Sequence, residues 1–357
     1  MAIDGTSMIA PILGFLVSFI VSVVIVRTKH LHGRFKLDTG DGVQKFHKSP
    51  TPRVGGISLA LGYFVVWLSM EGETRDLFGL VGLAGIAPLA FGMAEDLTQR
   101  VGARLLATIT SGLGFAMLTG YTIDSVDVYG VDAVLRIPLF AFAFTAFAIG
   151  GAANSINIID GFHGLASGTL IIIFLSFALA GWRVGDAVFV QLALLMAAIV
   201  GGFFVVNFPY GKLFLGDSGA YFTGYLMAIL AVMLPARNSE VSPWVSLLIL
   251  GYPVTETIVS MVRRSRGTAS HPGEPDDAHL HHIVHRNWAR GAAVMFNVPS
   301  LDSPMTSVIM WIFPVTTLLS VWFLELNTLS SVLFLALIVA CYVMAYRGLL
   351  AREKLEP

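Results

Sequence analysis

Long apolar stretches, one after another along most of the chain, constrain this sequence more than any single motif. A membrane-spanning helix needs about 20 apolar residues, with a range of roughly 17 to 25. Only 13% of the residues are charged, whereas a soluble domain carries about 25%. The sequence therefore predicts an all-α integral membrane protein, a single polytopic domain over residues 1–357. We expect about eleven transmembrane helices, at 8–26, 54–70, 76–94, 103–120, 137–153, 164–180, 186–207, 219–236, 244–262, 305–325 and 330–346.

The distribution of Lys and Arg predicts how the bundle lies in the membrane. Cytoplasmic loops are enriched in these residues. With the N-terminus outside, 18 of the 22 Lys and Arg fall in cytoplasmic segments and 4 fall outside. No basic residue precedes the first apolar stretch, and Arg27 and Lys29 follow it, which favours a span over a cleaved signal peptide. We therefore expect the C-terminus and a loop over 263–304 in the cytoplasm.

In this topology the polar segments share one side of the membrane. They are 41–56, 92–100, 154–168, 207–224 and 263–286, and all face the cytoplasm. The outside loops are short, apart from 121–136. The pattern predicts an active site at the inner membrane surface.

The residue types in these segments indicate metal-assisted phosphoryl chemistry. Carboxylate and amide oxygens suit Mg²⁺, which takes few protein ligands and keeps waters or phosphates. Residues three apart on a helix share about a third of its circumference, so Asn154, Asn157 and Asp160 can face one cavity. Cationic and hydrogen-bonding side chains suit anions. The candidate acidic residues are Asp96, Asp160 and Asp217, and the candidate anion-binding residues are Arg263, Arg264, Arg266, His279, His281 and His282.

Each motif also has a simpler interpretation. Asn154 can hydrogen-bond between helices, Asp217 can cap a helix, and the arginines can be topology anchors. The histidines can form a solvated loop or an adventitious zinc site, and Glu256 can be a polar packing group within a span. The single cysteine, Cys341, excludes a disulfide framework or a cysteine-based zinc site. No patch suggests a nucleic-acid partner.

Three segments in order resemble the polyprenyl-phosphate N-acetylhexosamine-1-phosphate transferases, the glycosyltransferase family 4 enzymes of the MraY and WecA types. The segments are "NSINIIDGFHGLASG" (154–168), "FLGDSGAYFTG" (214–224) and "DDAHLHHI" (276–283). They are similar to the family's N-x-x-N-x-x-D-G, G-D-x-G and H-x-H-H segments, and the resemblance covers about 41–286. The H-x-H-H form is more like the WecA type.

This resemblance implies transfer of a sugar 1-phosphate from a UDP-sugar to undecaprenyl phosphate, with release of UMP. It also implies a bacterial inner-membrane location, with the active site facing the cytoplasm. The implied cofactor is Mg²⁺, with Mn²⁺ as a substitute, bound by Asp217 and Asn157. The resemblance implies that Asp96 aligns or deprotonates the lipid phosphate and that Asp160 organises the metal and nucleotide site. The remaining implied substrate contacts are His47, Lys48, Asn154, Arg266, His279, His281 and His282.

Two positions depart from the family pattern. The paired Asp-Asp appears here as Glu95-Asp96, which leaves the role of Glu95 open. His163 stands where the family often has Asp or Asn, so we expect it to contact the uracil base, with loop packing as the alternative. The sugar, the glycan pathway and the oligomeric state, a homodimer included, stay open. A secondary transporter would show mid-span ionisable groups and internal repeats; it and a non-catalytic scaffold are the rival functions.

Overall fold

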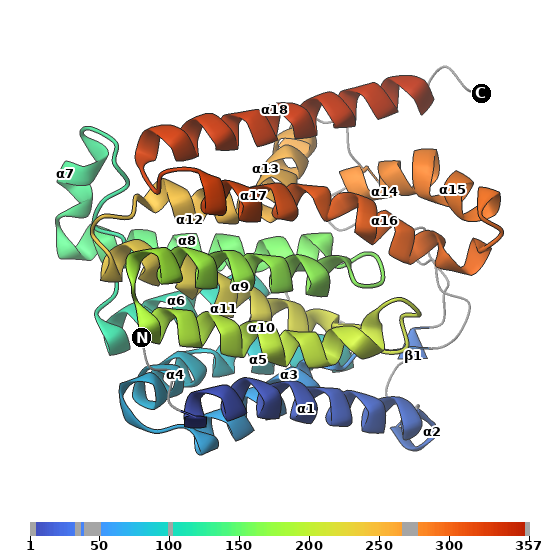
Figure 1. Ribbon diagram of the computed structural model, residues 1–357, viewed down its shortest axis with the longest axis horizontal. Coiled ribbons are helices and arrows are strands. Elements are labelled where there is room, and N and C mark those ends of the chain that lie inside the picture. The colour runs from blue at the N-terminus through green and yellow to red at the C-terminus, as the bar shows by residue number, and fades with distance from the viewer. Residues whose placement is uncertain (1–4, 33–36, 39–50, 99–102, 266–277, 354–357) are drawn as a thin grey trace.

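A computed structural model describes residues 5–32, 37–38, 51–98, 103–265 and 278–353 (Figure 1). It is a helical bundle with one two-residue antiparallel ladder between β1 (Leu37–Asp38) and β2 (Thr51–Pro52). The α-helices are α1 (Gly5–Arg27), α2 (Lys29–His32), α3 (Gly55–Ser69), α4 (Gly72–Ala84), α5 (Ile86–Thr98), α6 (Arg104–Thr119), α7 (Val131–Leu135), α8 (Pro138–Ile159), α9 (Leu165–Val184), α10 (Ala187–Asn207), α11 (Gly216–Arg237), α12 (Pro243–Ile249), α13 (Gly251–Ser265), α14 (Leu280–Val284), α15 (Arg290–Met295), α16 (Asp302–Met310), α17 (Ile312–Phe323) and α18 (Thr328–Glu353). A π-helix (His285–Ala289) follows α14, and a 3₁₀ turn (Pro299–Leu301) precedes α16.

The all-α polytopic architecture is confirmed. Among the described residues, seven helical segments are long and apolar enough to cross a membrane, or up to nine if each bent pair counts as one span. The shorter α3 and α6 are also apolar. Each of the eleven predicted stretches therefore coincides with a helix or a helix pair, while the number of spans and the side of each terminus stay predictions.

Two stretches that we expected as single helices, 76–94 and 244–262, are broken with a bend of more than 40°. Helices α4 and α5 meet at 41°, and α12 and α13 meet at 78°. The third residue of α5 is Pro88 and the third residue of α13 is Pro253. A proline ring clashes with the carbonyl four residues before it, and those carbonyls belong to Ala84 and Ile249, the last residues of α4 and α12. The proline positions therefore account for where both helices end.

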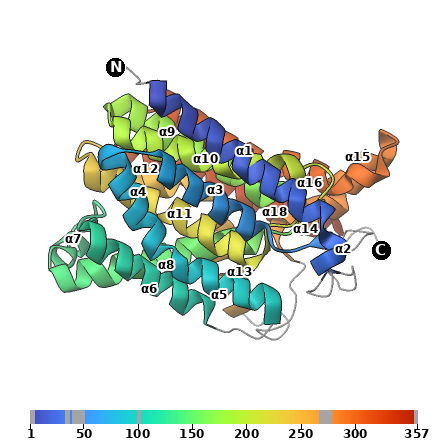
Figure 2. The same cartoon turned by 90° about the horizontal axis from the view of Figure 1, so that it is seen from below.

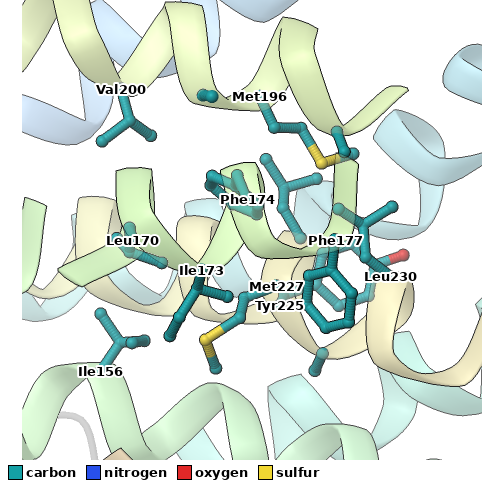
Figure 3. Packing of buried hydrophobic residues seen from close by; sticks show 14 of the residues in the cluster. Ile156, Leu170, Ile173, Phe174, Phe177, Met196, Val200, Tyr225, Met227 and Leu230 are labelled. Atoms are coloured by element: carbon teal, nitrogen blue, oxygen red, sulfur yellow. The ribbon is translucent and has the colours of Figure 1, made fainter. Parts of the chain in front are cut away.

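Helix α11 lies at the centre of the bundle (Figures 1 and 2). In its most apolar stretch 83% of the residues are buried, more than in any other of the seven candidate spans. It packs against α8, α5, α3 and α9. Figure 3 shows side chains of α9, among them Phe174, lying between Met196 of α10 and Met227 of α11. Helix α11 is therefore enclosed by neighbouring helices on several sides.

The two ends of the bundle differ in charge. Helix α1 begins at the end that carries α7, and α18 ends at the opposite end, beside α14 and α15 (Figure 1). The four basic residues assigned to the outside, Arg75, Arg136, Arg183 and Arg237, belong to segments at the α7 end. The polar motifs lie at the other end, which we call the site end.

Candidate active site

Four segments that are far apart in the sequence meet at the site end. They are 51–55, the last turn of α5, the end of α8 with the turn 160–164, and the start of α11. The Phe214 N–H donates to the Pro52 carbonyl, and the Gly55 N–H donates to the Phe214 carbonyl, both at 3.0 Å. Helices α5 and α8 both pack against α11. The acidic side chains of the first three motifs are therefore gathered around Asp217.

Asp96 caps the N-terminus of α11. Its carboxylate accepts hydrogen bonds from the Asp217 N–H at 2.8 Å, the Ser218 N–H at 3.0 Å and the Ser218 hydroxyl at 2.7 Å. The first N–H groups of a helix have no partner within the helix, and a carboxylate satisfies them well. Gly216, with φ +72°, has no room for a side chain, because a Cβ would lie 2.9 Å from Asp96 Oδ2. Asp96 therefore fixes the backbone at Asp217.

Asp217 also receives a hydrogen bond from α8. The Asn157 amide donates to Asp217 Oδ1 at 2.7 Å. Among the described residues no other side chain bonds to the Asn157 amide or the Asp217 carboxylate. Asn154 lies one turn earlier on the same helix and Asp160 directly after its end, both half-buried. The structure therefore brings Asn157 and Asp217 together, with Asp160 at the end of the same helix.

The site is acidic. Glu95, Asp96, Asp160 and Asp217 lie close enough to influence one another electrostatically. Burial raises the pKa of Asp160 to about 7; Arg53 opposes this rise in the pKa, and the charges of Asp217 and Asp96 add to it. Like charges disfavour the ionised form of a carboxyl group. The cluster is therefore suited to a cation.

Arg53 and Arg104 are site residues that the motifs did not reveal. The Arg104 guanidinium lies 3.3 Å from Glu95 Oε1 and donates to the Tyr221 hydroxyl at 3.1 Å. Arg53 acts electrostatically on Glu95 and Asp160. A signal was present for both, because Arg53 lies within the polar segment 41–56 and Arg104 begins an apolar stretch, where a charge is costly. Glu95 therefore forms an ion pair with Arg104 at the start of α6.

The donor set fits a divalent cation bound mainly by substrate and water. Among the described residues, no group of three or more His, Cys, Asp or Glu side chains is arranged to hold a metal by itself. Mg²⁺ does not need such a group, since it is usually held by one or two carboxylates together with phosphate oxygens and waters. Asp217 and Asn157, surrounded by three further carboxylates, offer oxygens of this kind.

His163 is built into the turn after α8. Its backbone N–H donates to the Ser303 hydroxyl oxygen at 3.0 Å, and its carbonyl accepts from the Ser307 hydroxyl at 2.8 Å. The ring nitrogen Nδ1 lies 3.1 Å from the Pro209 carbonyl, which only accepts, so Nδ1 carries the hydrogen. The ring stacks on Phe214 at 5.8 Å. These contacts are the ones expected if His163 packs within the loop. Its contact with the uracil base stays a prediction.

The three histidines of the H-x-H-H segment are buried beneath the turn 160–164. His279, His281 and His282 are 6%, 1% and 3% exposed. Phe162 packs against the rings of His281 and His282, at 5.7 and 5.3 Å between ring centroids. This burial disagrees with a solvated loop, because the segment forms the start of α14 and is covered by the bundle. Its contact with the substrates stays a prediction.

Three of the predicted substrate contacts lie outside the described residues. They are His47, Lys48 and Arg266. Arg263 donates to the Tyr346 hydroxyl at 3.0 Å and to the Ser260 hydroxyl at 3.2 Å, so it links α13 to α18.

Comparison with known proteins agrees with the motifs. The family model for glycosyl transferase family 4 matches residues 78–235, which include Glu95, Asp96, Asn157, Asp160 and Asp217. A probable undecaprenyl-phosphate N-acetylglucosaminyl 1-phosphate transferase of Bacillus subtilis is 27% identical over 278 residues, 77% of either chain. The undecaprenyl-phosphate alpha-N-acetylglucosaminyl 1-phosphate transferase of Escherichia coli is 27% identical over 68% of this chain and 67% of its own. The decaprenyl-phosphate N-acetylglucosaminephosphotransferase of Mycolicibacterium smegmatis is 29% identical over 66% of this chain and 65% of its own. With its three motifs in order and its acidic residues gathered at one end of the bundle, this chain is similar to glycosyl transferase family 4 over residues 78–235 and to these polyprenyl-phosphate sugar 1-phosphate transferases.

Proposed function

We propose that this protein transfers a sugar 1-phosphate from a UDP-sugar to a polyprenyl phosphate, and that N-acetylglucosamine 1-phosphate is the group transferred. An oxygen of the lipid phosphate attacks the β-phosphorus of the donor. The bond from that phosphorus to the bridging oxygen breaks, and UMP leaves with that oxygen. The names of the relatives support the acceptor and the sugar.

The observation that carries this proposal is the way Asp217 is held. The Asp96 carboxylate fixes its backbone and the Asn157 amide fixes its side chain. Both reactants are anionic, so an acidic site can bind them only through a cation. We propose that Asp217 and Asn157 hold Mg²⁺, which would neutralise the diphosphate and polarise its phosphorus–oxygen bonds. Positioning then supplies much of the remaining catalysis.

The two arginines supply positive charge on the protein side. Arg104 is half-exposed, and its guanidinium is anchored by Glu95 and Tyr221. Guanidinium groups bind phosphate oxygens through two parallel hydrogen bonds. We assign Arg53 and Arg104 to the phosphates of the substrates.

An apolar cavity beside α8 suits an acceptor with a long hydrocarbon chain. It has a volume of about 990 Å³, begins beside the loop 120–128 at the α7 end, and runs between α8, α11, α12 and α13. Its walls include Phe144, Phe147 and Ile258, and it reaches Ser155, two residues before Asn157. Burying apolar chain surface there is favourable. The cavity supports a lipid acceptor whose phosphate reaches the site end.

The site end is the cytoplasmic end in this proposal. Within the described ranges, four basic residues belong to segments at the α7 end, and the positive-inside rule then orients the site end inward. This location gives the site access to soluble UDP-sugars in the cytoplasm. The protein is accordingly a multi-pass protein of the inner membrane.

The decisive experiment measures UMP release. Purified protein is incubated with undecaprenyl phosphate, Mg²⁺ and a panel of UDP-sugars, and UMP and lipid-linked product are quantified together. We expect both to appear in equal amounts with UDP-N-acetylglucosamine. If the protein is folded and binds the lipid but none of the UDP-sugars in the panel yields UMP, it is a transporter or a scaffold instead.

A further inference from the structure

Glu256 is a carboxylate enclosed within the bundle and does not belong to the acidic cluster of Glu95, Asp96, Asp160 and Asp217. It lies on α13 and is 0% exposed. A buried carboxylate is costly unless it is paired and hydrogen-bonded. Its Oε1 atom lies 2.9 Å from His279 Nδ1 and 3.4 Å from the Leu280 backbone nitrogen. Glu256 therefore holds the start of α14.

The second oxygen of Glu256 faces the next histidine of the segment. Glu256 Oε2 lies 3.9 Å from His281 Nδ1. Both atoms are buried, and His281 Nδ1 has no hydrogen bond within the described part of the chain. The Tyr342 hydroxyl of α18 also interacts with the Glu256 carboxylate. The rings of His279 and His281 are stacked, with centroids 5.2 Å apart and planes 4° from parallel. One carboxylate thus faces the Nδ1 atoms of two parallel imidazoles.

The opposite edge of the second ring faces the active-site turn. A Cβ on Gly161 would lie 3.3 Å from His281 Nε2. Gly161 directly follows Asp160, whose carboxylate belongs to the acidic cluster. Glu256, His281 and the turn therefore form a continuous line of contacts from the interior to the site.

We propose that Glu256 is a positioning residue, which sets the orientation and tautomer of His279 and directs the H-x-H-H histidines toward the turn at Asp160. A carboxylate accepts, so His279 must place its hydrogen on Nδ1, and its Nε2 is the nitrogen left for a ligand. The same pairing with a carboxylate fixes ring orientation in metal-binding histidines. This inference rests on the proposed function, because the ligand that His279 Nε2 would contact is the UDP-sugar.

The first test compares two Glu→Gln variants. Glu256→Gln keeps the shape of the side chain and removes its charge. We expect the KM for UDP-sugar to rise about tenfold or more, because hydrogen bonds to charged groups are the strong ones. We expect the KM for undecaprenyl phosphate and the Tm to change little. The matched control is Glu353→Gln, which loses the Arg286 and Asn287 contacts but touches none of the three histidines.

The second test asks whether Glu256 acts through His279. In a His279→Asn background, Glu256→Gln should raise the KM for UDP-sugar no further. The effects of substitutions at two residues in direct contact are not additive. Independent, multiplicative effects of the two substitutions would overturn the proposal. Equal loss of activity toward both substrates, in step with the loss of folded protein, would also overturn it.

The third test needs no turnover and no Glu256 variant. Wild-type protein labelled with ¹⁵N-histidine reports which ring nitrogen of His279 carries hydrogen, with His279→Asn supplying the assignment. We expect the hydrogen on Nδ1. Hydrogen on Nε2 would refute the role of Glu256 and leave the transferase proposal standing. Absence of UMP release with every donor would refute the transferase and leave the Nδ1 result standing.

Discussion

Asp96 is the residue for which structure and resemblance make different predictions. The family resemblance implies that Asp96 aligns or deprotonates the lipid phosphate. Its contacts instead make it the N-terminal cap of α11, which fixes Asp217. Asp96→Asn separates the two roles. The asparagine keeps the shape of the side chain but has only one accepting oxygen, and its NH₂ group must face one of the donors that Asp96 satisfied.

The size of the effect follows from the number of hydrogen bonds lost. If the amide oxygen keeps both Ser218 donors, the NH₂ group faces the Asp217 N–H and that bond is lost. A hydrogen bond to a charged group contributes about 1.5–3 kcal/mol. Since about 1.4 kcal/mol is tenfold, the equilibrium constant for the arrangement of Asp217 should fall by about 10 to 150-fold. The half-saturating Mg²⁺ concentration should rise by up to the same factor, because apparent affinity scales with the competent fraction.

A Mg²⁺ titration of the initial rate of UMP release measures this effect. We expect Asp96→Asn to need more Mg²⁺ and to approach wild-type turnover at saturation. Ser218→Ala, which removes one donor and leaves the Asp96 charge in place, should shift the titration in the same direction by less. If Asp96→Asn abolishes turnover at every Mg²⁺ concentration and Ser218→Ala behaves as wild type, the capping role is refuted and Asp96 acts on the lipid phosphate.

Three further predictions concern the metal, the base and the orientation. Asp217→Asn should lower turnover by orders of magnitude with an unchanged Tm, and EDTA should abolish wild-type turnover until Mg²⁺ or Mn²⁺ is added; full activity in chelator would contradict the metal site. His163→Ala should raise the UDP-sugar KM by up to about tenfold, the value of one ordinary hydrogen bond, without changing the lipid-phosphate KM; a lower Tm with equal damage to both substrates would favour loop packing. In a chain lacking Cys341, Tyr129→Cys beside α7, where the tyrosine is fully exposed, should react with an impermeant thiol reagent in intact cells, and Ser270→Cys should not. The opposite labelling would reverse the orientation.

The architecture could be predicted because membrane thickness sets the length of an apolar stretch. All eleven predicted stretches coincide with helices, and the broken ones carry Pro88 and Pro253 as a visible signal. The order of the motifs predicted the similarity to glycosyl transferase family 4 before any contact was known. Helical periodicity also placed Asn157 and Asp160 at one helix end, because residues three apart share a face.

The pairing of the acidic residues was decided only by the tertiary structure. Asp96 meets Ser218 across 122 positions of sequence, Asn157 meets Asp217 across 60, and Glu256 meets His279 across 23. A carboxylate can cap a helix, bind a cation or pair with a histidine, and its sequence neighbours are the same in each case. The role depends on which donors lie within about 3 Å. For Asp96 those donors are brought there by the packing of α5 on α11, and for Glu256 by the burial of His279 at the start of α14.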